Sequence, residues 1–176
     1  MKILLPFVPG LPRTYTTLTT YFLLKKDILT SWDAALWPCK DPGNYEVGLR
    51  SCWGLDDLLI WEHDIVPTLT MLEALADCPH PVCAQAYLLH PASSGKATPV
   101  YAHRRTLTRF IEEGETQAAF VGFGLTRISL AVQKRIPSGL FAQNWWGDLD
   151  TRFSIKLMEL ELPACIHWPA ATHNHQ

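Results

Sequence analysis

The clearest feature of the hydrophobic pattern is a short apolar run at residues 58–61 that ends abruptly in Glu62, His63 and Asp64. A continuous apolar run of this length is typical of a fully buried strand, and the apolar spacing that follows predicts a helix over residues 68–76. The three polar residues therefore follow the carboxyl end of a predicted central strand. In open α/β sheets, ligands bind at that end of the strands.

The two acids in this stretch, Glu62 and Asp64, have two interpretations. Their oxygens suit Mg²⁺ or Mn²⁺, which commonly bind through one or two carboxylates together with substrate phosphates. The same acids would also stabilise the start of the following helix through its dipole, without binding any ligand. This stretch alone leaves both interpretations open.

A first strand is predicted at residues 3–8, and the proline and glycine cluster at residues 9–12 must end it in a loop. A loop after the first strand of an α/β sheet usually faces the ligand. Arg13 lies just beyond this loop and is a candidate phosphate contact, although a solvated surface arginine is the commoner outcome.

The rest of the chain carries weaker hydrophobic patterns. Residues 14–24 and 29–37 fit either a helix or a strand. We expect loops at residues 38–44 and 91–99, the second of them a flexible flap. The other predicted elements are a helix at 45–53, a strand at 82–88, a strand or bend at 100–102, a helix at 106–111, and a strand at 120–129 that Gly122 and Gly124 interrupt, followed by a helix to Arg135.

The carboxyl-terminal third combines acids, tryptophans and histidines. Asp148 and Asp150 open a predicted helix, where helix capping alone would also select Asp. Trp145 and Trp146 lie in the preceding loop, and their faces can stack on a sugar or a base, although core packing explains one of them equally well. The segment 166–176 contains three histidines that either stay in solvent or reach back to a metal. We expect this polar terminus to be mobile without bound ligands.

Length and composition limit the architecture and the partners. A chain of 176 residues that is 48% hydrophobic predicts one domain, residues 1–176, with one core. The formal charge is −2 and no run of Lys or Arg occurs, so strong binding to a nucleic-acid backbone is not expected, although a nucleic-acid acceptor is not excluded. No apolar segment approaches membrane-spanning length and the start does not fit a signal peptide, which predicts a cytoplasmic protein.

The chain has five cysteines, an odd number with irregular spacing. This fits reduced thiols better than a disulfide framework. Cys78 and Cys83 have the spacing of half a zinc site, but no second cysteine pair completes it. The sequence therefore favours a loop with two semi-buried thiols over structural zinc.

The order of these features resembles the GT-A glycosyltransferases, especially the family 2-like branch, over about residues 57–175. The triplet Glu62-His63-Asp64 is similar to the DxD element of that family, with Glu in place of the first Asp. Gly122-Phe123-Gly124, with Arg127 after it, is similar to the glycine-containing segment before the acceptor helix. Residues 149–157 resemble the ED-x-x-L-x-x-R-L pattern, with Leu149 in place of the usual Glu and Asp150 at the position of the catalytic base.

The resemblance implies a single GT-A-like, Rossmann-like α/β domain with a central, mostly parallel sheet flanked by helices. Residues 1–56 would form a shortened nucleotide-binding half, and residues 57–176 the metal, acceptor and catalytic half. The implied activity is transfer of a sugar from a nucleotide-sugar donor, with UDP-sugar expected, to an acceptor hydroxyl with inversion. It needs a divalent metal, Mn²⁺ or Mg²⁺. The acceptor stays open among a glycan, a lipid carrier, a protein and a modified DNA base.

The resemblance also implies roles for particular residues. Asp64, Glu62 and His173 or His175 would hold the metal. Asp150 would act as the base, with Asp148 as the second catalytic candidate. The candidate donor contacts are Pro6, Val8, Arg13, Glu62, His63 and Asp64, and the candidate acceptor contacts are Gly122, Gly124, Arg127, Trp145 and Trp146.

Two other classes of function remain open at this point. One is a protein with the same fold that binds a nucleotide or a glycan without catalysis. The other is a zinc-dependent hydrolase in which His63, Asp64, His173 and His175 hold the metal, although no HExxH motif or comparable close pair of ligands occurs.

Overall fold

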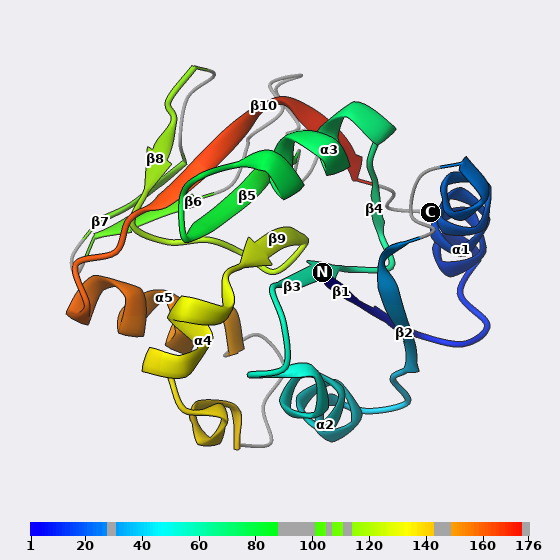
Figure 1. Cartoon of the computed structure of the whole chain (residues 1–176), viewed down its shortest axis with the longest axis horizontal. Coiled ribbons are helices and arrows are strands. Elements are labelled where there is room, and N and C mark those ends of the chain that lie inside the picture. The colour runs from blue at the N-terminus through cyan, green and yellow to red at the C-terminus, as the bar shows by residue number, and fades with distance from the viewer. Residues whose placement is uncertain (28–30, 88–100, 105–106, 111–113, 143–148, 174–176) are drawn as a thin grey trace.

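The computed structural model describes residues 1–27, 31–87, 101–104, 107–110, 114–142 and 149–173 (Figure 1). Within these residues, eight strands form one sheet in the order β2-β1-β3-β9-β5-β10-β4, with β8 paired to β10. The strands of this sheet are β1 (Lys2–Phe7), β2 (Asp33–Pro38), β3 (Leu58–Trp61), β4 (Ile65–Val66), β5 (Val82–Tyr87), β8 (Gln117–Ala118), β9 (Leu125–Ile128) and β10 (Ala164–His173).

The sheet is mixed but mostly parallel. Strands β2, β1, β3, β5 and β10 run in one direction, while β9 runs antiparallel between β3 and β5. The short strands β4 and β8 run antiparallel to β10. The prediction of an α/β fold with a central, mostly parallel sheet flanked by helices is therefore confirmed.

Helices cover both faces of the sheet. In Figure 1, α1 and α3 lie on one side of it, and α2, α4 and α5 lie on the other. Strands β6 and β7 form a separate two-stranded sheet. The bounds are α1 (Pro12–Asp27), α2 (Pro42–Cys52), α3 (Leu69–Asp77), α4 (Leu130–Arg135), the 3₁₀ helix η2 (Ser138–Phe141), α5 (Leu149–Glu159), β6 (Tyr101–Arg104) and β7 (Leu107–Phe110).

The core explains why the central strands have uninterrupted apolar sequences. All four residues of β3 are 0% exposed, because helices pack on both faces of the strand. Trp61, the last of them, packs edge-on against Tyr21 of α1 and donates from Nε1 to the Ile65 carbonyl at 2.8 Å. Complete burial of side chains this size contributes about 1.5–3 kcal/mol each. This packing fixes the position of the end of β3, from which the chain continues into Glu62.

Several sequence predictions hold and others do not. The predicted strands at residues 3–8, 58–61 and 82–88 and the predicted helices at 45–53 and 68–76 are confirmed as β1, β3, β5, α2 and α3. The two undecided segments form α1 and β2. The loop predicted at 38–44 is shorter, because Pro38 still belongs to β2 and Pro42 begins α2. The flap predicted at 91–99 lies outside the described residues.

Two predictions were wrong for reasons that lie outside the local pattern. Residues 107–110 form a strand and not a helix, because β7 pairs antiparallel with β6. The terminus that we expected to be mobile forms β10 up to His173. This strand pairs first with β5 and then, at its end, with β4. In both cases, pairing with a segment elsewhere in the chain decides the structure.

Candidate functional site

The carboxyl ends of β1, β2 and β3 meet at one edge of the sheet. Phe7, the last residue of β1, pairs with Pro38, the last residue of β2, and its carbonyl accepts a hydrogen bond of 2.7 Å from the Cys39 amide. The loop after β1 and the Glu62–Asp64 stretch after β3 flank the same edge. The predicted donor contact Pro6 is a buried residue inside β1, and Val8 directly follows that strand.

Glu62 is the first residue beyond the central strand, and hydrogen bonds fix both its backbone amide and its carboxylate. Its amide donates to the Gly124 carbonyl at 2.8 Å, and its Oε1 accepts a hydrogen bond of 2.8 Å from the Tyr45 hydroxyl of α2. Burial and the charges of Asp64 and Asp150 together raise the pKa of Glu62 to about 8, although the Tyr45 hydrogen bond opposes the rise. A cation bound beside Glu62 would lower this pKa and favour the charged carboxylate.

The start of α1 is tied to the turn that contains Glu62. Arg13 donates from Nε to Nε2 of His63 at 3.1 Å, and Thr17 donates from Oγ1 to the His63 carbonyl at 2.7 Å. Thr14 donates to the Val8 carbonyl at 2.8 Å. These contacts bring the predicted donor residues Arg13 and His63 together, and they connect the loop after β1 with the acidic turn after β3.

Gly122 and Gly124 lie at the same edge, before β9, and the ring of Tyr87 packs against their backbone. A Cβ on Gly124 would lie 2.6 Å from Cε1 of Tyr87, and a Cβ on Gly122 would meet the hydroxyl of the same ring. Glycine is thus required at both positions for the fit of an aromatic side chain. Tyr87 and Tyr45 are site residues that the sequence analysis missed. Each is a tyrosine at an otherwise apolar, buried position, which is the one signal that singles them out.

Asp150 approaches from the other side of the edge, in the first turn of α5. Its Oδ1 accepts a hydrogen bond of 2.8 Å from the Thr151 amide, and its charge contributes to the raised pKa of both Glu62 and Tyr45. A Cβ on Gly122 would lie 3.7 Å from the other carboxylate oxygen of Asp150. The charges of Asp64 and Asp150 therefore both act on Glu62, and we call these three residues the acidic group, although their oxygens do not all lie within 4.8 Å of one another. Asp148, Trp145 and Trp146 lie outside the described residues.

The last strand returns the chain to this group. After pairing with β5, β10 has a register shift between His167 and Ala171 and then pairs with β4, with His173 opposite Ile65. Ile65 directly follows Asp64, so the backbone of His173 lies beside the acidic turn, as the metal prediction requires. His175 lies outside the described residues.

Arg127 does not join this group, although we expected it among the acceptor contacts. Because β9 runs antiparallel, Arg127 lies toward the opposite edge of the sheet from Gly124. There it forms an ion pair of 2.6 Å with Asp57 and donates to the carbonyls of Cys78 and His80 at 3.0 and 3.1 Å. Its role in the structure is to connect β9 to the segments at that edge.

The carboxylate oxygens at the carboxyl edge of the sheet are suitable ligands for a hard divalent cation. Carboxylate oxygens are the ligands that Mg²⁺ and Mn²⁺ take, and three acidic side chains come from the elements that meet at this edge. Glu62 and Asp64 lie one residue apart after β3, and Asp150 lies on a different element, in the first turn of α5.

Comparisons with known proteins support the fold. The sequence matches no family model and no curated protein. The structure is similar to that of A197 from STIV, with a TM-score of 0.56 and 17% identity, over 95% of this chain and 82% of that one. It is also similar to the inositol-1-phosphate CTP transferase from T. maritima, with a TM-score of 0.51 and 8% identity, over 98% of this chain and 88% of that one. The chain thus shares a Rossmann-like α/β fold with these proteins.

None of the helices in the described part of the chain is long and apolar enough to cross a bilayer.

Proposed function

We propose that the protein is a divalent-metal-dependent glycosyltransferase that uses a nucleotide-sugar donor, with UDP-sugar as the expected class, and transfers the sugar with inversion. The observation that carries this proposal is the convergence of Glu62 and Asp64, after β3, with Asp150, at the start of α5. Sugar transfer from a nucleotide needs a cation for the leaving diphosphate and a base for the attacking hydroxyl. These three carboxylates, on two elements, match both needs.

Asp64 and Glu62 would hold the metal, with His173 as a further ligand from β10. When bound, Mg²⁺ or Mn²⁺ neutralises the charge that develops on the leaving diphosphate. Tyr45 fixes one oxygen of Glu62 through its hydrogen bond of 2.8 Å, and the Glu62 amide is fixed by Gly124. One oxygen of Glu62 is therefore held in place by the protein itself, and groups held in this way contribute most to electrostatic stabilisation.

Asp150 would act as the general base toward the acceptor hydroxyl. Asp150 lies in the first turn of α5, where its Oδ1 accepts from the Thr151 amide and its Oδ2 lies 3.7 Å from the position that a Cβ on Gly122 would take. The ring of Tyr87 packs against the backbone of Gly122 and Gly124. We propose that the acceptor hydroxyl and the sugar bind beside this ring, next to Asp150.

Residues 1–56 would form the nucleotide-binding half and residues 57–176 the catalytic half. Pro6 and Val8 lie next to the loop after β1. The guanidinium of Arg13 lies at this edge as well, and its hydrogen bond to His63 fixes its orientation. Arg13 would meet the diphosphate from the side opposite the metal. Arginine suits this role because its planar group can donate to two phosphate oxygens at once.

Nucleotidyl transfer is a second candidate function, favoured by Arg13 at the loop after β1. The T. maritima protein of the same fold is named as a CTP transferase, and a cation at that loop is placed to meet a nucleoside triphosphate. The products distinguish the two reactions. Nucleotidyl transfer from a triphosphate releases pyrophosphate, while sugar transfer releases a nucleoside diphosphate.

The test is release of nucleoside diphosphate from UDP-, GDP-, CDP- and dTDP-sugars with Mn²⁺, with pyrophosphate release from the matching triphosphates plus a sugar phosphate measured in parallel. We expect slow diphosphate release from one donor, because water can replace the acceptor. Chelator and Asp64→Ala should abolish it, while Glu73→Gln, an exposed position on α3, should not change it. Release that persists with chelator or in Asp64→Ala would overturn the proposal.

A further inference from the structure

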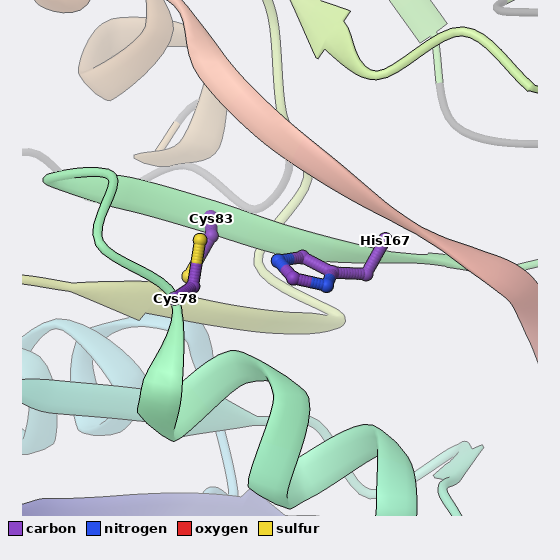
Figure 2. A group of neighbouring side chains, drawn as sticks. All are labelled: Cys78, Cys83 and His167. Atoms are coloured by element: carbon purple, nitrogen blue, oxygen red, sulfur yellow. The ribbon is translucent and has the colours of Figure 1, made fainter.

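Three possible metal ligands meet far from the acidic group. Sγ of Cys78, Sγ of Cys83 and a ring nitrogen of His167 all lie within 4.8 Å of one another. Figure 2 shows the two sulfurs side by side and the ring of His167 pointing toward them, with one ring nitrogen nearest the sulfurs. Both cysteines are buried and His167 is partly buried. Solvent is therefore largely excluded from the place where these atoms meet.

The fold itself creates this juxtaposition. Cys78 is the C-cap residue of α3, while Cys83 lies at the amino end of β5. Cys83 pairs with Cys165 of the parallel strand β10, and His167 is two residues further along, so these three side chains project from the same face of the sheet. Helix α3 packs against β5 and β10 on that face.

A fourth candidate ligand lies beside the three. Sγ of Cys165 is 3.8 Å from Nε2 of His167, and burial, with a smaller effect of the nearby Cys78 thiol, raises the pKa of Cys165 to about 11. A tetrahedral zinc ion has bonds of about 2.3 Å to sulfur and 2.0 Å to nitrogen, which separates neighbouring ligand atoms by roughly 3.5–3.8 Å. The ligand atoms of Cys78, Cys83 and His167 need to approach one another by at most about 1.3 Å to reach these separations, and the Cys165 sulfur, which is not within 4.8 Å of all three, must turn further toward the ion.

We propose that Cys78, Cys83 and His167, with Cys165 as fourth ligand, form a structural zinc site that fastens the carboxyl end of α3 to the amino ends of β5 and β10. It is a closed set of sulfur and nitrogen ligands, which selects Zn²⁺ over the hard cations expected at the carboxylates. It lies at the opposite edge of the sheet from Glu62 and Asp64. The inference is independent of the proposed transferase activity.

The surroundings suit a zinc ion with several thiolates. Arg127 donates from Nη1 to the Cys83 sulfur at 3.8 Å and to the Cys78 carbonyl at 3.0 Å, so it would offset the negative charge of three thiolates and one neutral imidazole around a dication. The carboxyl terminus of α3 presents the negative end of its dipole to the cation. The three ligand thiols give up their protons to solvent when the metal binds, which leaves the zinc and its ligands with a net charge of −1 that the Arg127 guanidinium faces.

The alternative explanations are buried thiols without metal and a disulfide between Cys78 and Cys83. The experiment is elemental analysis of the full-length protein, purified without chelator or histidine tag, together with Co²⁺ titration of protein stripped of metal. We expect about one zinc per chain and an intense thiolate-to-cobalt charge-transfer absorption, which carboxylate sites do not produce. Cys78→Ser and His167→Gln should lose the zinc, while the buried but distant Cys52→Ser should keep it.

Three results would overturn the proposed zinc site, and the first two are measured on wild-type protein, so they do not depend on whether a variant folds. Substoichiometric zinc with no thiolate band in wild-type protein would overturn the proposal, and so would an intact mass lower by two hydrogens that reduction restores. Retention of zinc by both Cys78→Ser and His167→Gln would overturn it as well. Asp64→Ala should keep the zinc even though it removes the proposed site for Mn²⁺, so failure of the transferase proposal is recognised separately.

Discussion

Replacing Glu62 by Gln should change how the stability of the metal-free protein depends on pH. Gln has the same shape and can still accept from the Tyr45 hydroxyl, but it does not titrate. Burial and the charges of Asp64 and Asp150 raise the pKa of Glu62 from 4.5 to about 8 in the folded chain. Between these two pH values the folded state binds a proton that the unfolded state has lost. The free energy of unfolding therefore falls as pH rises through this window.

The size of the effect follows from the pKa difference. At about 1.36 kcal/mol per pKa unit, the gap between 4.5 and about 8 corresponds to roughly 5 kcal/mol. Glu62 is partly exposed, and solvent reduces the cost of its charge, so we expect a loss of roughly 2–3 kcal/mol between pH 5 and pH 9. Glu62→Gln should match the wild type at pH 5 and be more stable by that amount at pH 9.

The assay is urea unfolding followed by tryptophan fluorescence from pH 5 to pH 9, with chelator and without nucleotide. All other titrating groups are common to both proteins, so the difference between them isolates Glu62. Glu73→Gln, on the exposed side of α3, should show no such difference. A stability difference between Glu62→Gln and wild type that stays constant across this range would refute the electrostatic reasoning.

Three further predictions concern the base, the opposite edge and the glycines. Asp150→Asn should lower sugar transfer by about 10²- to 10⁴-fold while donor binding stays within a factor of a few, as measured by product formation and by titration calorimetry; equal losses in both would argue against a base. Asp57→Ala leaves the buried guanidinium of Arg127 without its carboxylate, so urea unfolding should show a loss of about 3 kcal/mol, and a loss below about 1 kcal/mol would mean that the pair is not structural. Gly124→Ala should cost about 1–3 kcal/mol in the same assay through overpacking, whereas Gly139→Ala, with no atom within 4 Å of the added methyl, should be nearly neutral; equal effects would contradict the packing.

The sequence predicted the elements whose structure is decided by burial. The apolar run of β3 and the helical spacing of α3 are local patterns, and both elements formed where expected. The position of Glu62 and Asp64 at a strand end followed from the same pattern. The position of Asp150 at the start of a helix could also be predicted, because it depends only on the helical pattern that follows, and the structure places Asp150 in the first turn of α5.

What the sequence could not predict depends on partners distant in the chain. β7 and β10 are strands because β6 and β5 pair with them, and no local periodicity encodes that pairing. The direction of β9 decided that Arg127 lies away from Gly124, and this direction is a property of the sheet. The two halves of the Cys78, Cys83 and His167 cluster are separated by more than eighty residues, so spacing rules for zinc motifs could not find it.

The central claim is that the carboxylates after β3 bind a nucleotide through a divalent ion. Titration calorimetry of UDP, GDP, CDP and dTDP into the protein, with Mn²⁺ and separately with chelator, tests it most directly. We expect one nucleotide to bind with Mn²⁺ and chelator to weaken that binding at least tenfold. Asp64→Ala should abolish the metal-dependent part of the binding, while Glu73→Gln should keep it. Binding of no nucleotide, or binding that neither chelator nor Asp64→Ala alters, would contradict the account.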